Sequence, residues 1–249
     1  MTQIGYGYGS EWQLLRMLGH HRDYFFKELR KQLHLSQDAE IHWLDYGFDE
    51  SGTIVSGDKE HKKREFFEAI PEIFTPEVIS DFNKDKFGTK LNQNWDGIFW
   101  VDKTVYLVEA KAHVKEIFSN IQSDKERSLS IIEEYFKETK EWFSISSDND
   151  WKKVYYQMAN RVAFLKLLHS HGIEAKLVNL YFVNGYEKRV KDPDSDKYHI
   201  IPNKKTSVEE WEKVIIEEEN YLGISGLKNK SIFHVFIECK PKVVKTLHI

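Results

Sequence analysis

Two acids and a lysine in the middle of the chain, Asp96, Glu109 and Lys111, are residue types that can hydrolyse phosphodiester bonds. Carboxylate oxygens are ligands that Mg²⁺ prefers, and its sites usually contain only one or two of them beside water and phosphate. A bound metal lowers the pKa of water and polarises a phosphoryl group. A lysine ammonium stabilises charge on a phosphate oxygen, or helps to position and deprotonate the attacking water. If the fold brings these three residues together, they predict metal-dependent hydrolysis.

The flanking sequence predicts a β-hairpin that places the two acids side by side. Apolar runs at 97–101 and 104–112 are joined by Asp102-Lys103. A two-residue turn puts Asp96 opposite Glu109, whereas a three-residue turn would shift the pairing by one position. Directly opposed residues have Cβ atoms roughly 4.5–5.5 Å apart, and like charges there destabilise the pair. The hairpin therefore predicts a cation between the two carboxylates.

The second strand of this hairpin turns polar only at its end. Side chains alternate between the two faces of a strand, and residues 105–108 are apolar on both faces. We therefore expect a central strand that is covered on both sides. Glu109 and Lys111 share one face at the end of this strand, where an unpaired buried charge is costly. The backbone carbonyl of Ala110 is a candidate for a further metal ligand.

The spacing in this region closely resembles the motif of the PD-(D/E)xK nuclease superfamily, to which restriction endonucleases belong. Asp96 is followed by twelve intervening residues and then by Glu109-Ala110-Lys111. Apolar residues at 106–108 precede the second acid, as the family pattern requires. Trp95 stands where the family has a proline, so the match departs from the pattern at that position.

The resemblance covers residues 10–185 by element order, but it is sharp only over 95–112. It implies an α/β restriction-endonuclease-like core, with a mixed β-sheet flanked by α-helices. It also implies an endonuclease that uses Mg²⁺, or Mn²⁺ as a substitute, with Asp96 and Glu109 as metal ligands. DNA is the expected substrate, with RNA left open, and restriction, defence or repair is the expected role. Many such proteins work as dimers, so the resemblance also implies a homodimer.

Three further residues match places that the family uses around its metal. Glu11 falls in the first helix, where many members carry a glutamate, although the helix dipole also favours an acid there. Gln157 falls in the helix after the lysine, as in one branch of the family, and Arg161 replaces the tyrosine of that branch. Gln157 and Arg161 share one helix face because they are four residues apart. They are candidates for substrate binding, with an exposed surface pair as the alternative.

Helices and strands alternate along the chain, which favours a mixed sheet flanked by helices. We expect one domain over 1–249, with its core at 10–185 and 186–249 as an extension of the same fold. The segment 75–93 reads as irregular, and Asp150 reads as the cap of a helix. The other elements follow from hydrophobic periodicity, with helices near 10–33, 58–70, 114–145, 150–171 and 207–219, and strands near 40–57, 175–183 and 231–238.

Composition sets the outer limits of the prediction. Apolar residues make up 41% of the chain and charged residues 31%, which suits a folded domain. Cys239 is the only cysteine, which excludes an intramolecular disulfide and a cysteine-based metal site. The sequence contains no apolar run long enough for a membrane helix and no signal peptide pattern, so a cytoplasmic protein without a membrane partner is expected.

Charge leaves an alternative open. The net charge of −4 counts mildly against a protein that coats duplex DNA, because such proteins neutralise phosphates with basic residues. Lysines at 228–245 and basic residues at 188–205 are candidate phosphate contacts or ordinary surface residues. A non-catalytic module that binds nucleic acid or protein is therefore the rival prediction, and a phosphoesterase for small molecules is a third. The histidines show no spacing diagnostic of zinc.

Overall fold

A computed structural model describes residues 9–45, 61–62, 65–87, 93–122, 126–184, 189–191, 198–200 and 206–239. Its centre is a five-stranded sheet in the order β1-β4-β5-β6-β9. The strands are β1 (His42–Trp43), β4 (Gly97–Val101), β5 (Thr104–Lys111), β6 (Ala175–Val183) and β9 (Ile232–Glu238). The β1–β4 and β4–β5 pairs are antiparallel, whereas β5–β6 and β6–β9 are parallel. The predicted mixed sheet is therefore confirmed.

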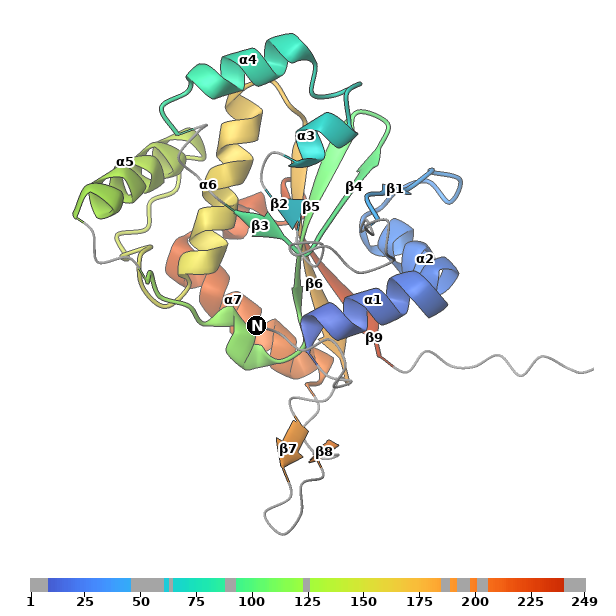
Figure 1. Ribbon diagram of the computed structural model, residues 1–249. Coiled ribbons are helices and arrows are strands. Elements are labelled where there is room, and N and C mark those ends of the chain that lie inside the picture. Colours follow the sequence, from blue (N-terminus) through green and yellow to red (C-terminus); the bar gives the residue numbers. More distant parts are fainter. Residues whose placement is uncertain are drawn as a thin grey trace, which may run out of the picture.

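Helices cover both faces of this sheet (Figure 1). One face carries α1 (Ser10–His20) and α2 (Arg22–Gln32). The other carries α3 (Glu65–Ala69), α4 (Pro76–Lys84), α5 (Glu126–Trp142), α6 (Tyr156–Ser170) and α7 (Val208–Leu222). Smaller elements are the 3-10 helices η2 (Val114–Ile117) and η3 (Ser225–Leu227), and the strand pairs β2 (His61–Lys62) with β3 (Asn94–Trp95) and β7 (Arg189–Lys191) with β8 (Tyr198–Ile200).

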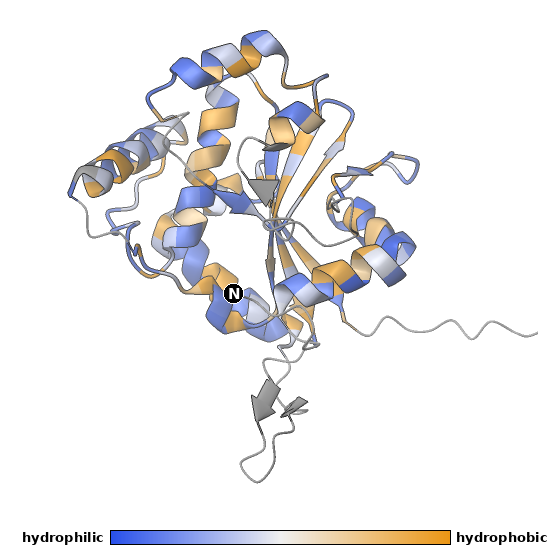
Figure 2. Cartoon of the chain, in the orientation of Figure 1, coloured by the Kyte–Doolittle hydropathy of each residue, from blue (hydrophilic) through white to orange (hydrophobic). Residues whose placement is uncertain are grey.

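The two faces of β5 enter two separate hydrophobic cores. Val105 and Leu107 pack in the core beneath α6 and α7. Tyr106, Val108 and Ala110 pack in the core beneath α1 and α2. Figure 2 shows apolar residues on the strands between the helical layers. The predicted central strand, covered on both sides, is confirmed.

The hairpin has the predicted two-residue turn. Val101 pairs with Thr104, and the register continues to Gly97 opposite Val108. Asp102 takes a positive φ of 51°, which suits the first position of a tight hairpin turn. The next step beyond this ladder leads to Asp96 and Glu109, as the sequence predicted.

Several boundaries differ from the sequence-based prediction. The helix expected near 10–33 is divided into α1 and α2 at His21, residues 61–62 of the helix expected near 58–70 form strand β2, and the helix expected near 114–145 is η2 followed by α5.

Two further differences have a local cause. The segment expected to be irregular contains α4, which Thr75 caps through its side chain and Pro76 begins; proline is favoured at the first position of a helix. Asp150 does not cap α6, which begins only at Tyr156. Its carboxylate instead accepts the backbone N–H of Lys152 in a turn, a local bond that competes with helix initiation.

Several other expectations can be placed on the fold. No helix in the part of the chain that the structure describes is long and apolar enough to cross a membrane.

Cys239 is buried, and burial raises the pKa of its thiol to about 12, so it is not an activated nucleophile. Of the lysines expected as phosphate contacts near the C-terminus, those at 240–245 lie outside the described residues, as do those at 188 and 204–205.

Candidate active site

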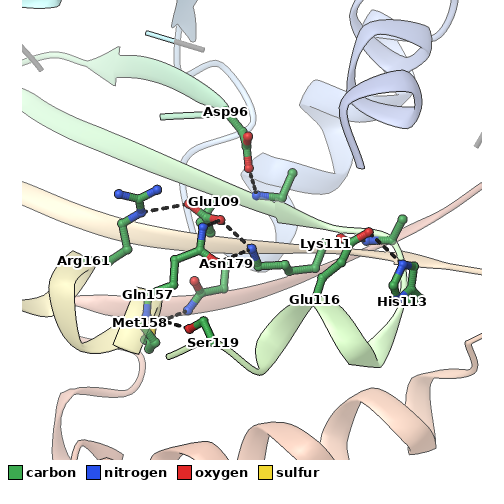
Figure 3. A network of polar contacts seen from close by, with 12 residues as sticks. Asp96, Glu109, Lys111, His113, Glu116, Ser119, Gln157, Met158, Arg161 and Asn179 are labelled. Atoms are coloured by element: carbon green, nitrogen blue, oxygen red, sulfur yellow. Dashed lines mark hydrogen bonds and ion pairs between the residues drawn. The ribbon is translucent and has the colours of Figure 1, made fainter. Parts of the chain in front are cut away.

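Glu109 is the centre of a buried polar cluster at the end of β5 (Figure 3). The residue is 5% exposed. Its Oε1 accepts hydrogen bonds from Lys111 Nζ at 2.5 Å and from Gln157 Nε2 at 2.7 Å. Its Oε2 accepts a hydrogen bond from Arg161 Nε at 2.8 Å. Three other predicted site residues, Lys111, Gln157 and Arg161, thus bind Glu109 directly.

Gln157 links the acid to the lysine. Its Oε1 accepts a hydrogen bond from Lys111 Nζ at 2.8 Å while its Nε2 donates to Glu109. The backbone N–H of Gln157 donates to Ser119 Oγ at 2.8 Å, which ties the first turn of α6 to the segment after η2. Gln157 therefore fixes the relative positions of Glu109 and Lys111.

Arg161 lies one turn further along α6 and is almost fully buried. It is 7% exposed, so the alternative of an exposed surface pair is wrong for this residue. Its guanidinium lies 4.5 Å from the ring centroid of Trp95, an attractive cation–π arrangement. Trp95 thus contacts the site, at the position where the family has a proline. Because its Nε donates to Glu109, Arg161 compensates the negative charge of that carboxylate in this structure.

The charges in this cluster compensate one another. Burial raises the pKa of Glu109, but Arg161 and Lys111 outweigh burial, and the pKa lies below its usual value. Burial lowers the pKa of Lys111, but Glu109 and Asp96 outweigh this, and the pKa lies above its usual value. Glu109 is therefore a carboxylate and Lys111 an ammonium near neutral pH.

Asp96 lies at the edge of this cluster and not within it. Its Oδ2 accepts the backbone N–H of Ala110 at 2.7 Å (Figure 3). Burial and the negative charge of Glu109 raise the pKa of Asp96 to about 8, against the opposing effect of Lys111. The two acids are thus close enough to repel, as the hairpin predicted, while Lys111 and Arg161 partly offset the charge of Asp96.

A local break in β-sheet alternation explains where Asp96 points. Trp95 and Ile98 pack in the same core, although residues three apart on a regular strand face opposite ways. Asp96 occupies a bend between β3 and β4. Its side chain therefore reaches the backbone of β5, where it accepts the N–H of Ala110.

The donor chemistry at Asp96 and Glu109 fits a magnesium ion. Both supply hard carboxylate oxygens, and a magnesium site usually contains one or two protein carboxylates. Within the described ranges, no three His, Cys, Asp or Glu side chains gather as a ready-made metal group. The backbone N–H of Ala110 donates to Asp96. The role of the Ala110 carbonyl as a metal ligand stays a prediction.

Glu11 belongs to the opposite layer of the molecule. It lies in α1, which packs on the face of the sheet away from α6. One of its carboxylate oxygens, Oε2, is buried and has no hydrogen-bond partner among the described residues. The structure therefore leaves Glu11 outside the cluster around Glu109, and its predicted role as a metal ligand is not supported by a contact.

A small cavity opens beside Glu109 and contains two polar residues that the sequence analysis missed. Asn179 lies on β6 directly across from Glu109, and Glu218 reaches the cavity from α7. Both are buried, at 4% and 3% exposed. The full lining is Glu109, Lys111, Ile117, Gln157, Met158, Asn179, Tyr181 and Glu218.

Both missed residues left a signal in the sequence. Asn179 interrupts the apolar run 175–183, where a polar side chain must face a polar neighbour or remain unsatisfied. The buried residues of α7 are Trp211, Ile215, Glu218, Glu219 and Leu222. This is the spacing of one helix face, so two acids occupy the stripe where apolar residues are expected.

Comparisons with protein-family models, with curated proteins and with solved structures find no match to this chain.

Proposed function

We propose that this protein is a Mg²⁺-dependent endonuclease of the PD-(D/E)xK type that cleaves DNA, with RNA as the alternative substrate. One observation carries the proposal. An acid and a lysine two residues apart, Glu109 and Lys111, lie at the end of a buried strand and share Gln157 from the following helix. Asp96 approaches the same strand from its antiparallel neighbour.

The order of elements supports a restriction-endonuclease-like core. Helices α1 and α2 precede three antiparallel strands, β1, β4 and β5. Helix α6 then crosses over to β6, which is parallel to β5. The first acid precedes one strand and the second acid ends the next, which is the arrangement that the motif implies. Strand β9 extends this sheet beyond β6.

In the proposed mechanism, Asp96 and Glu109 would hold the metal, which when bound supplies a more acidic water and a polarised phosphoryl group. Lys111 orients the water or stabilises negative charge on the phosphate. Before a cation binds, Gln157 holds the ammonium of Lys111 beside Glu109, as in the structure. Arg161 keeps Glu109 ionised and therefore able to bind a cation.

A second function has one observation in its favour. Both oxygens of Glu109 are already engaged, by Lys111 and Gln157 on one and by Arg161 on the other. Such a compensated cluster also suits a nuclease fold that binds nucleic acid or protein without cutting. A homodimer and a cytoplasmic location belong to the proposal as well.

Plasmid nicking in the presence of Mg²⁺ or Mn²⁺ tests the proposal. Lys111→Ala and Asp96→Ala should each lower the cleavage rate about 10²–10³-fold, the usual effect of losing one group that stabilises the transition state. Lys137→Ala is the matched control, because the side chain of Lys137 is 77% exposed. Its rate should equal that of the wild type.

Three outcomes would contradict the proposal. Equal cleavage by the wild type and Lys111→Ala would remove the mechanism. Retained binding of DNA or RNA with no cleavage would favour the binding module. Cleavage of small phosphodiesters without cleavage of any nucleic acid would favour a phosphoesterase for small molecules.

A further inference from the structure

Helix α7 places two adjacent acids on its buried side, and their surroundings differ. Glu219 is paired: its Oε1 lies 2.9 Å from His234 Nε2, and its Oε2 lies 3.8 Å from Lys228 Nζ. Glu218 makes no hydrogen bond or ion pair with any other residue that the structure describes, yet it is only 3% exposed. A buried carboxyl group without a partner is costly, so its presence requires an explanation.

Glu218 shares the small cavity with Glu109, Lys111 and Gln157. Burial raises the pKa of its carboxyl to about 8, and the ammonium of Lys111 is the largest influence in the opposite direction. Lys111 is therefore near enough for its charge to act on Glu218. In the structure, however, Lys111 is bonded to Glu109 and Gln157.

Binding of a divalent cation at Glu109 creates a conflict on one oxygen atom. Oε1 of Glu109 already accepts hydrogen bonds from Lys111 and Gln157. Glu109 cannot give this oxygen to a divalent cation and also keep the ammonium there without close repulsion between two positive groups. If Lys111 moves away, it needs another negative partner, because an uncompensated buried charge is strongly unfavourable.

We propose that Glu218 is a positioning residue that accepts the ammonium of Lys111 when Glu109 binds a divalent cation. The inference rests on the proposed metal-dependent function and adds a residue that its motif does not include. Lys111 then stays charged and inside the cavity that it shares with Glu218, while Glu109 becomes free for the cation. Among the described residues, Glu218 has no hydrogen bond or ion pair that it would have to break in order to accept Lys111.

Mn²⁺ affinity, measured by isothermal titration calorimetry without nucleic acid, tests this role separately from cleavage. Glu218→Gln keeps the shape of the side chain but cannot become a carboxylate, so we expect about tenfold weaker binding, equivalent to about 1.4 kcal/mol. Glu217→Gln is the matched control because Glu217 is the preceding residue and is exposed. Its affinity should equal that of the wild type.

A double-mutant cycle distinguishes a partner of Lys111 from a direct metal ligand. In a Lys111→Gln background there is no ammonium to receive, so Glu218→Gln should have no further effect on Mn²⁺ affinity. A tenfold loss that persists in this background would mean that Glu218 binds the cation itself, which overturns the inference. Glu218→Met, which suits the neighbouring Ile117 and Met158, repeats the comparison if the glutamine variant does not fold.

The remaining outcomes separate this inference from the proposed function. Wild-type Mn²⁺ binding with unchanged affinity in Glu218→Gln would overturn the role of Glu218 alone. Absence of Mn²⁺ binding in the wild type would overturn both. Loss of cleavage in Lys111→Ala together with unchanged Mn²⁺ affinity in Glu218→Gln would leave the nuclease proposal standing without this residue.

Discussion

The two faces of β5 end differently, although they belong to one strand. On the face toward α1 and α2, the residues stay apolar as far as Ala110. On the face toward α6, Leu107 is followed by Glu109 and Lys111, both largely buried. The first face is closed by side chains that pack, and the second by side chains that form hydrogen bonds.

The two faces separate the residues that stabilise the fold from the residues to which we assign chemistry. Burial of apolar surface stabilises a fold by about 25 cal/mol per Å². A buried ion cluster is weak evidence for stability, since apolar replacements of similar volume are often neutral or stabilising. The fold would therefore be at least as stable with an apolar end to both faces. The polar end beneath α6 is better explained by the metal-dependent chemistry that we propose for Glu109 and Lys111.

The largest expected effect comes from removing the counter-charge on the polar face. Arg161→Met should lower the free energy of unfolding by about 3–5 kcal/mol, because it leaves Glu109 buried with less positive charge. Urea denaturation measures the change. Arg22→Met is the control on the α1–α2 side: Arg22 pairs with Asp45, and the side chains are 41% and 54% exposed. Its expected cost is under about 1 kcal/mol.

Charge compensation on the polar face can be tested in the same experiment. Combining Glu109→Gln with Arg161→Met removes both charges, so part of the stability lost in Arg161→Met should return. A loss below about 1 kcal/mol in Arg161→Met, or no recovery in the double variant, would show that the polar face is not held by charge compensation.

A more gradual effect, smaller over any one pH unit than the loss in Arg161→Met, is expected from pH on the polar face. Burial raises the pKa of Glu218 from 4.5 to about 8 in the folded protein. Between these values the folded state holds a proton that the unfolded state has lost, so stability falls as pH rises. The slope from this group is at most about 1.4 kcal/mol per pH unit. Below the unfolded pKa the effect is fully present as stability, and above about pH 8 it is lost.

Melting temperatures in EDTA between pH 5 and pH 8 measure this dependence. Glu218→Gln removes the titrating group, so its stability relative to the wild type should improve as pH rises. Glu217→Gln, on the exposed side of α7, should follow the wild-type profile. Parallel profiles for Glu218→Gln and the wild type would mean that burial does not raise the pKa of the Glu218 carboxyl.

The contrast between the faces of β5 was readable from the sequence because it depends on local rules. Alternation along 104–111 fixed which residues share a face, and a two-residue turn at Asp102 fixed the register that brings Asp96 toward Glu109. Both rules act over a few residues. They predicted the hairpin, the mixed sheet and the contact between Glu109 and Lys111.

What the sequence did not reveal depends on contacts between distant segments. Glu218 follows Glu109 by more than a hundred positions. The apolar stripe of α7 marks it as a buried acid, but only the docking of α7 over the site brings it beside Glu109. The direction of Asp96 depends on a bend before β4 that breaks strand alternation. Arg161 lies in helix α6, and its burial beside Trp95 of β3 depends on how these two elements pack. None of these follows from spacing alone.

The smallest expected effect tests the packed face. A Cβ added at Gly97 would lie 2.4 Å from Trp43 Cζ2, so Gly97→Ala should destabilise the fold by about 1–3 kcal/mol through overpacking. Gly19→Ala is the control in the same layer, because nothing lies within 4 Å of its Cβ; a helical alanine should be neutral or stabilise by up to about 1 kcal/mol. Urea denaturation measures both changes. A loss below about 0.5 kcal/mol in Gly97→Ala would show that Trp43 does not close this face by tight packing, and the contrast between a packed face and a hydrogen-bonded face would then be wrong.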